Sequence, residues 1–343
     1  MESKAPSGSD AAVIGGPRRY SWTGLIRIAV GLVLLALLTW YGQIDLRAVS
    51  DLVNAPGTIL TCVALVFISL PLSALRWGML LRALNVSIPF MKLFHIVSIS
   101  TMLNVFLLGA FGGDAVRLLY AWREVRHGRG RIAASIVADR VIALLGVIIL
   151  ALLFTIFNWS RMRQEPWLAA LAVGVFLAFA TSVVGCCMLF LTPAAVDRMV
   201  DALKHLPRLV TLLVHLRSIT LMLRNSPLIL LGGLALGLLV PMLTAAGVIV
   251  VANALAIGQL TVADYAFAVP LTVLVNTLPI SPNGLGVGEA AFDQICRWLE
   301  PVPSGVGYSS IFFAYRAVGM LTCLCGVVSY LSYRPSPLEE LPG

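Results

Sequence analysis

Long uninterrupted runs of apolar residues dominate the chain. Six of them reach the roughly 20 residues that an α-helix needs to cross a bilayer. They fall at about 24–42, 57–80, 133–157, 167–191, 228–254 and 308–331. Apolar and polar residues do not alternate along these runs, as they would in the strands of a transmembrane barrel. The pattern therefore predicts an all-α polytopic membrane protein with six full transmembrane helices.

Two further apolar stretches, 91–120 and 265–300, are interrupted by residues that end helices. Glycines break the first stretch just before Asp114, and prolines and glycines break the second just before Glu289. Non-helical backbone at membrane depth is tolerated where protein buries it or where it lines a water-filled cavity. We therefore expect each stretch to enter the membrane and return to the same side as a re-entrant hairpin.

The distribution of basic residues supports this topology. With both stretches re-entrant, the cytoplasmic side carries 16 Lys and Arg residues and the outer side carries four. If 91–120 crossed once, the basic segments 123–131 and 192–225 would face outside instead. Cytoplasmic loops are the ones enriched in Lys and Arg. We therefore expect 91–120 to enter from the cytoplasm, 265–300 to enter from outside, and both termini to be cytoplasmic.

The two interrupted stretches share an order of residue types. Each has an asparagine, then a glycine-rich break, then an acid, and then an arginine about one helix later. Asp114 precedes Arg140 by 26 residues, and Glu289 precedes Arg316 by 27. The first unit begins outside and the second inside, so the spacing predicts an inverted-topology repeat, which is typical of transporters. Chance similarity between glycine-rich breaks is the alternative.

Composition agrees with a membrane protein and excludes several other classes. Charged residues make up 12% of the chain and hydrophobic residues 59%, whereas soluble domains carry about 25% charged residues. The net charge of +8 belongs to loops between spans, so it indicates topology and contact with anionic lipid rather than nucleic-acid binding. Six cysteines show no metal-ligand spacing, and we expect no metal and no cofactor.

The remaining segments are polar or amphipathic. Residues 1–17 are rich in Ser, Gly and Ala and predict a disordered cytoplasmic tail, and 336–343 form a C-terminal tail. The segment 192–225 is basic and amphipathic, which is typical of helices on a membrane surface. We expect 18–335 to form a single membrane-embedded domain.

Charges inside the membrane are the main candidates for function. An arginine in a span costs about 2.5–3.5 kcal/mol on insertion scales, so it needs a partner or a wet cavity. The helix that begins after each break offers N–H groups to an anion such as phosphate, and glycines there allow close approach of a ligand. The predicted substrate-binding residues are Arg117, Arg140, Arg316, Asn104, Asn276, Gly112, Gly113, Gly284, Gly286 and Gly288. The predicted proton-coupling or ion-pair residues are Asp114, Asp139 and Glu289.

A purely structural role is the alternative for the same residues. Asp114 or Asp139 would pair with Arg140, and Glu289 would pair with Arg316. Arg117 lies one turn beyond Asp114 on the same helix face. The asparagines Asn104 and Asn276 would then cap or bridge the breaks. A pair that opens for a ligand would serve both purposes.

The segments Asn104–Arg117, Ala138–Arg140, Leu278–Glu289 and Tyr315–Arg316 resemble the lysylphosphatidylglycerol synthase transmembrane-domain family. The resemblance covers about 20–335 and implies a flippase-like protein of a bacterial-type cytoplasmic (inner) membrane. The aminoacyl-transferase domain of fused members is expected to be absent from this chain, as in stand-alone members. The resemblance therefore does not imply synthase activity.

Three functions follow from these features. The first is a lipid transporter, not an enzyme, that moves an anionic or modified phospholipid between leaflets through a midplane cavity of arginines and acids. The second is a membrane-embedded transferase that uses a lipid-phosphate donor. The third is a non-transporting scaffold of a lipid-synthesis complex. The expected partner is a membrane lipid, with a second copy of the chain or a lipid-synthesis enzyme as further candidates, and no nucleic acid.

Overall fold

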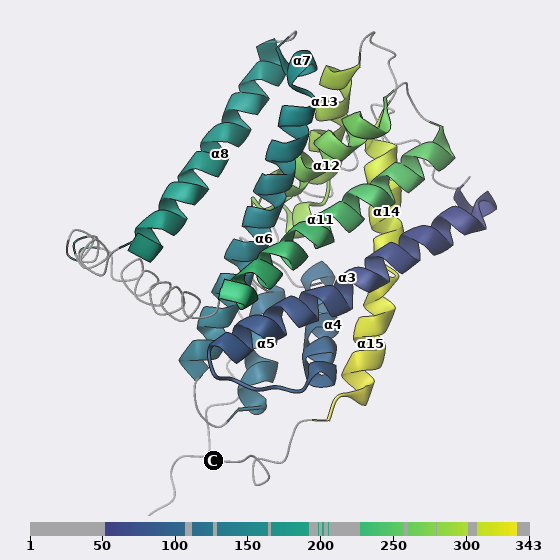
Figure 1. The fold of residues 1–343 in the computed structure, drawn as a ribbon. Coiled ribbons are helices and arrows are strands. Elements are labelled where there is room, and N and C mark those ends of the chain that lie inside the picture. The colour runs from purple at the N-terminus through teal and green to yellow at the C-terminus, as the bar shows by residue number, and fades with distance from the viewer. Residues whose placement is uncertain are drawn as a thin grey trace, which may run out of the picture.

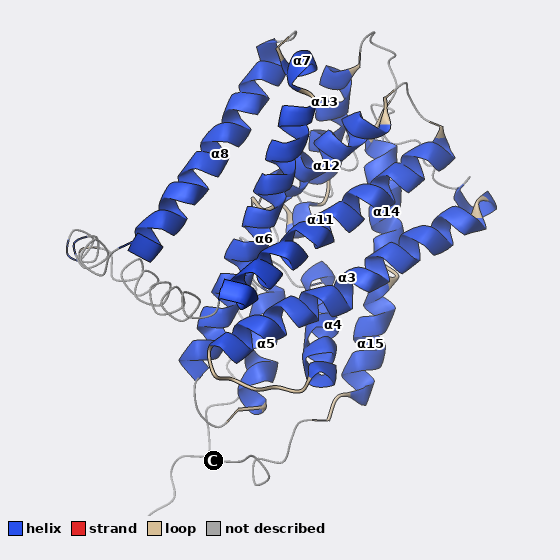
Figure 2. Cartoon of the chain, viewed as in Figure 1, coloured by secondary structure: helices blue, strands red, loops and turns tan. Residues whose placement is uncertain are grey.

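The structure is a computed structural model of the 343-residue chain. It describes residues 52–106, 112–125, 129–163, 166–191, 227–256, 260–278, 280–300 and 307–334, with isolated positions at 198, 201 and 205. Helices and the turns that connect them account for the described residues, and Figure 2 shows no strand among them. The protein is a multi-pass membrane protein. The predicted span 24–42 and the amphipathic segment 192–225 lie outside the described residues, apart from those isolated positions.

Five long apolar helical segments are long enough to cross a membrane. They confirm five of the six predicted spans, with different bounds. The elements are α3 (Pro56–Ala83), α6 (Arg129–Phe157), α8 (Pro166–Leu191), α11 (Pro227–Leu255), and the pair α14 (Ser309–Gly319) and α15 (Thr322–Ser332). The last two stack end to end in Figure 1 and form one span, Ser309–Ser332. The short elements η1 (Leu52–Asn54) and α7 (Trp159–Met162) precede α3 and α8.

The two interrupted stretches form four shorter helices. These are α4 (Phe90–Phe106), α5 (Gly112–Arg123), α12 (Val262–Asn276) and α13 (Val287–Leu299), with the 3-10 turn η2 (Pro282–Gly284) before α13. At 1.5 Å per residue, the longest of them, with 17 residues, is shorter than the hydrocarbon core of about 30 Å. α4 packs on α5, and α12 packs on α13. The chain therefore breaks in both places where glycines and prolines predict it.

Small residues allow two spanning helices to cross closely. A Cβ atom added to Gly146 on α6 would lie 2.1 Å from the carbonyl oxygen of Gly237 on α11. A Cβ atom added to Gly237 would lie 2.9 Å from the carbonyl oxygen of Ile142. Helices in lipid associate by this kind of close backbone packing, since burial of apolar surface gives little driving force there. The crossing fixes α6, which carries two of the candidate charges, against the rest of the bundle.

The outer surface of the helices is apolar. On α8, Trp167, Val173 and Leu177 are 66%, 57% and 60% exposed, and Leu331 on α15 is 77% exposed. In water this surface would be unusual, whereas acyl chains cover it in a bilayer. α8 stands at the periphery of the bundle, where it contacts α6, α7 and α13 (Figure 1).

Candidate functional site: a polar cavity between the two breaks

A cavity of about 560 Å³ lies where the two interrupted stretches meet the spanning helix α6. α4 contacts η2 at this place, so the first break faces the second. The polar residues of the lining come from both breaks and from α6. They are Asn104, Arg140, Asn276, Thr277, Ser281, Asn283 and Gly284. Arg140 is the one charged residue among the described lining residues.

Arg140 is a half-exposed charge in the interior of a spanning helix. It is the twelfth residue of α6, and its side chain is 53% exposed. Its Nε donates to Asp114 Oδ2 at 2.8 Å, which confirms the predicted pairing of these two residues. Among the described residues, its two Nη groups have no hydrogen-bond partner. A guanidinium at this depth requires water or a polar ligand on its open side.

An asparagine lies against the glycines that follow each break. Asn104 Oδ1 accepts a hydrogen bond from the Gly113 N–H at 3.0 Å. A Cβ atom at Gly113 would lie 2.6 Å from that asparagine side chain. Asn276 lies beside Gly284 and Gly288 in the same manner, where added Cβ atoms would come within 2.2 and 2.5 Å of Asn276 Oδ1. The close approach predicted at these glycines therefore accommodates an asparagine side chain.

Of the five predicted glycines, Gly284 is in the described lining of the cavity. Gly113, Gly286 and Gly288 are buried outside this lining, and Gly112 is half-buried. Ser100 Oγ donates to the Gly113 carbonyl at 2.7 Å, which fixes the start of α5 against α4.

Arg316 holds the turn of the second break. Its Nη2 donates to the Asn283 carbonyl at 2.7 Å, and its Nη1 donates to the Gly284 carbonyl at 3.0 Å. Nη1 also lies 3.2 Å from Glu289 Oε1, which confirms the predicted Glu289–Arg316 pair. Glu289 is fully buried, and its Oε2 accepts from the Gly286 N–H at 2.7 Å, so it caps α13. Arg316 is absent from the described lining of the cavity.

Positive backbone φ angles explain why asparagine and glycine occupy the turn before α13. Asn283, Gly284 and Gly286 have φ of +50°, +69° and +77°. Glycine adopts this region without penalty and asparagine tolerates it, whereas other residues are strained there. The resulting turn directs the carbonyls of Asn283 and Gly284 to Arg316.

A second ion-pair cluster lies behind Arg140 and was only partly predicted. Asp139 accepts from Arg76 Nε at 2.7 Å and from Arg117 Nη1 at 2.9 Å. The Arg117 guanidinium lies over the ring of Trp77, 4.1 Å from its centroid. The predicted alternative of Asp139 pairing with Arg140 is wrong, because Arg76 and Arg117 occupy this carboxylate. Arg117, which shares a helix face with Asp114, turns to Asp139 instead.

Arg117 is buried, and part of its guanidinium has no hydrogen-bond partner among the described residues. Its side chain is 9% exposed, and its Nε and Nη2 atoms have no partner among the described residues. It does not line the cavity described above. The adjacent pairs Arg117–Asp139 and Arg140–Asp114 both join α5 to α6. Arg76, Arg117 and Asp139 form a buried cluster with one positive charge in excess, whereas the pair of Arg140 and Asp114 is balanced.

Arg76 and Asn283 are not among the site residues that the sequence predicts. Arg76 is one of the 16 basic residues predicted to be cytoplasmic, but it lies inside α3 and is 6% exposed. The signal was available, because Arg76 interrupts an otherwise apolar helical run. Asn283 stands between Pro282 and Gly284, which is typical of a turn, and only the structure places its side chain in the cavity lining.

A polar cluster near the start of α4 and the end of α5 joins three elements. Glu124 accepts from Lys92 Nζ at 2.6 Å and from the Tyr333 hydroxyl at 2.5 Å. Burial, and then the hydrogen bond to Glu124, raise the pKa of Tyr333, so this phenol stays protonated. The cluster fixes α4, α5 and the residues after α15 to one another.

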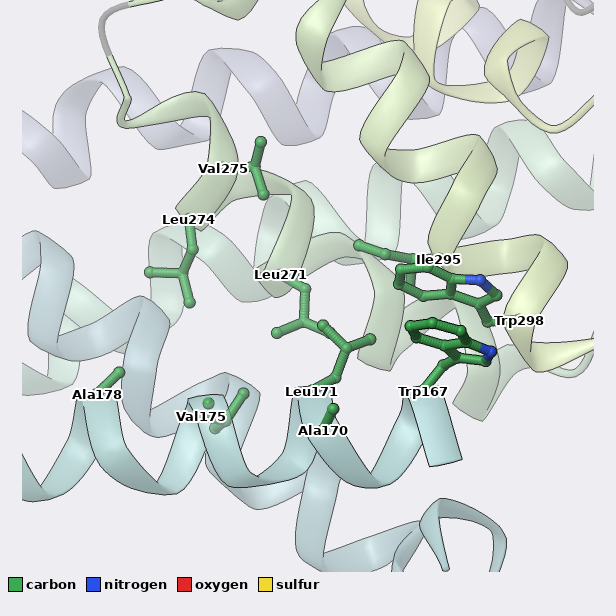
Figure 3. A pocket seen from close by; sticks show the side chains of 11 residues that line it. Trp167, Ala170, Leu171, Val175, Ala178, Leu271, Leu274, Val275, Ile295 and Trp298 are labelled. Atoms are coloured by element: carbon green, nitrogen blue, oxygen red, sulfur yellow. The ribbon is translucent and has the colours of Figure 1, made fainter. Parts of the chain in front are cut away.

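An apolar pocket lies on another face of α12. It has a volume of about 360 Å³ and is enclosed by α8, α12 and α13. In Figure 3, the side chains of Trp167 and Trp298 stack at one end, and Ala178, Leu274 and Val275 lie toward the other. The centroids of the two tryptophan rings are 6.4 Å apart, and the ring planes are nearly parallel. A Cβ atom added to Gly174 in the lining would meet nothing within 4 Å, so the pocket is open there.

A family model, lysylphosphatidylglycerol synthase TM region, matches residues 24–326. The chain belongs to this family. The match includes both breaks, α6 and the arginines Arg140 and Arg316, and it extends over most of the chain. It confirms the resemblance that the sequence motifs indicate.

Two archaeal proteins are similar over part of their length. A UPF0104 membrane protein of Pyrococcus horikoshii is 28% identical over 129 residues, which cover 37% of this chain and 38% of the relative. A UPF0104 membrane protein of Methanothermobacter thermautotrophicus is 29% identical over 173 residues, 47% of this chain and 50% of the relative. The matched region thus spans half or less of each relative.

Proposed function

We propose that the protein is a lipid transporter that moves an anionic or modified phospholipid between the leaflets of a cell membrane. The observation that carries the proposal is Arg140, a half-exposed guanidinium in the interior of a spanning helix that lines a polar cavity. A charge at this depth is typical of a substrate or ion pathway. Family membership supports the proposal, because the family is linked to lipid modification and flipping.

The shorter helices support a transporter architecture. α4 with α5, and α12 with α13, form the two re-entrant hairpins of an inverted-topology repeat in this proposal, the first from the cytoplasm and the second from outside. The support is that each pair packs together, that none is long enough to span, and that an asparagine fits against glycines after each break. Both termini are then cytoplasmic.

The two cavities together suit an amphiphile. Val273, Asn276 and Thr277 of the α12 region border the polar cavity, whereas Leu271, Leu274 and Val275 border the apolar pocket. In our proposal a headgroup occupies the polar cavity and an acyl chain occupies the apolar pocket. Two acidic residues among the described ones are engaged structurally: Asp264 forms a capping box with Thr261 at the start of α12, and Glu300 accepts from the Tyr308 hydroxyl. These contacts favour transport over the transferase alternative.

A leaflet-accessibility assay tests the proposal. Purified protein is reconstituted in liposomes with a fluorescent phosphatidylglycerol probe, and the fraction accessible to a membrane-impermeant quencher is followed over time. We expect faster equilibration than in empty liposomes. Arg140→Gln should slow it by about tenfold to a hundredfold, because a charge-assisted hydrogen bond contributes roughly 1.5–3 kcal/mol.

Arg82→Gln is the matched control, since Arg82 is an exposed arginine of α3 outside the cavity. Equal rates for Arg140→Gln and wild type would contradict the proposed site. No protein-dependent movement would contradict transport itself.

A further inference from the structure

We infer that the headgroup taken by the polar cavity is a phosphodiester with an uncharged, hydroxyl-rich substituent, and that aminoacylated, cationic headgroups are disfavoured. This inference rests on the proposed transport function and narrows it to a substrate class. It comes from the chemistry of the described lining residues, which include one cation, three asparagines and two hydroxyl residues.

The charge of the cavity lining favours an anionic headgroup. Arg140 is the one charged side chain in the described lining, and its acid partner Asp114 bonds only Nε. Arg76 and Arg117 share the carboxylate of Asp139 away from the lining, whereas Arg140 lines the cavity and has two Nη groups without a partner among the described residues. Phosphodiester oxygens can accept hydrogen bonds from these Nη groups, whereas a lysyl ester would place two ammonium groups beside a guanidinium, with no carboxylate in the described lining.

The amide side chains of the lining favour an uncharged, hydroxyl-bearing substituent on the headgroup. Asn104 uses its Oδ1 for the Gly113 N–H, which leaves its NH₂ group as a donor. Asn283 is exposed to the cavity, and its backbone carbonyl is held by Arg316. Amides offer donors and acceptors without charge, so they match hydroxyl groups. They cannot neutralise an ammonium group as a carboxylate would.

Four acyl-labelled probes separate charge from hydroxyl content. Phosphatidylglycerol is anionic with hydroxyls, phosphatidylmethanol is anionic without them, phosphatidylethanolamine is zwitterionic, and lysyl-phosphatidylglycerol is cationic. With wild-type protein in liposomes we expect phosphatidylglycerol to equilibrate fastest and phosphatidylmethanol next. The lysyl probe should be slower than phosphatidylglycerol by about tenfold.

Asn283→Asp tests the lining directly by placing a carboxylate in the cavity. Aspartate also tolerates the left-handed backbone of position 283, so the turn is retained. The variant should slow phosphatidylglycerol and speed the lysyl probe. Asn85→Asp is the matched control, because Asn85 has φ of +55°, is exposed and lies outside the cavity.

The outcomes separate this inference from the function on which it rests. Equal rates for the lysyl and phosphatidylglycerol probes would overturn the inferred charge preference while transport stands. Equal rates for phosphatidylglycerol and phosphatidylmethanol would overturn the hydroxyl preference. If none of the four probes moves faster than in empty liposomes, transport itself is overturned.

Discussion

The two breaks contain the same residue types but use them differently. At the second break, Arg316 donates to two backbone carbonyls and pairs with a fully buried Glu289. At the first, Arg140 bonds one aspartate through Nε and leaves its side chain 53% exposed. Nearly equal acid-to-arginine spacing thus produces a fixed turn in one half and a half-open cation in the other. Spacing along a helix predicts which charges meet, whereas burial and backbone geometry decide what they do.

The largest expected difference is in stability. Arg316→Gln leaves buried Glu289 without its cation and frees two carbonyls, so the free energy of unfolding should fall by about 3–5 kcal/mol. Arg140→Gln removes a half-exposed pair and should cost about 0–1 kcal/mol. Thermal unfolding of both variants in one detergent measures this difference. Equal losses would mean that the two arginines serve the same role.

Adding a methyl group at the glycines should give the next largest difference. Gly284→Ala forces a Cβ into a left-handed conformation, 2.2 Å from Asn276 Oδ1, and should cost about 1–3 kcal/mol. Gly113→Ala meets the side chain of Asn104, without a positive φ, and should cost less. Unfolding midpoints at matched protein and detergent concentrations check the order. A larger loss at Gly113 would show that the first break is the more tightly constrained one.

The smallest expected effect concerns the apolar pocket, which α8, α12 and α13 line. Gly174→Phe should fill the pocket and slow lipid movement about twofold to fivefold, equivalent to losing up to roughly 1 kcal/mol of acyl-chain contact. Its folding should be unaffected, since a Cβ there meets nothing within 4 Å. Gly185→Phe has the same open surroundings on α8 outside the pocket and serves as the control. Equal slowing by both variants would remove the pocket from the pathway.

Much of the fold could be predicted because the bilayer imposes simple rules. Five spans follow from apolar length alone, and the breaks follow from glycine and proline. The pair of Glu289 and Arg316 was predicted, and Asp114 was one of the two predicted partners of Arg140. These features depend on local sequence, so the sequence is sufficient to find them.

The ion-pair partners of Arg76 and Arg117 could not be predicted from the sequence. Arg76 reaches Asp139 from α3, which is 63 residues away in sequence, and no periodicity encodes such a contact. Arg117 had a nearer acid at Asp114, yet packing over Trp77 directs its guanidinium to Asp139. A choice between two partners at similar helical spacing depends on how three helices pack.

The sequence by itself determined that this chain crosses the membrane, where its helices break, and which family it resembles. Those properties depend on apolar length, on residues that cannot continue a helix, and on short motifs. Only the tertiary structure decided that Arg140, Asn104, Asn276 and Asn283 share one cavity and that Arg316 is occupied by a turn. The physical reason is that a site of this kind is made by helix packing, which brings together side chains that are distant in sequence and buries some charges while leaving another open.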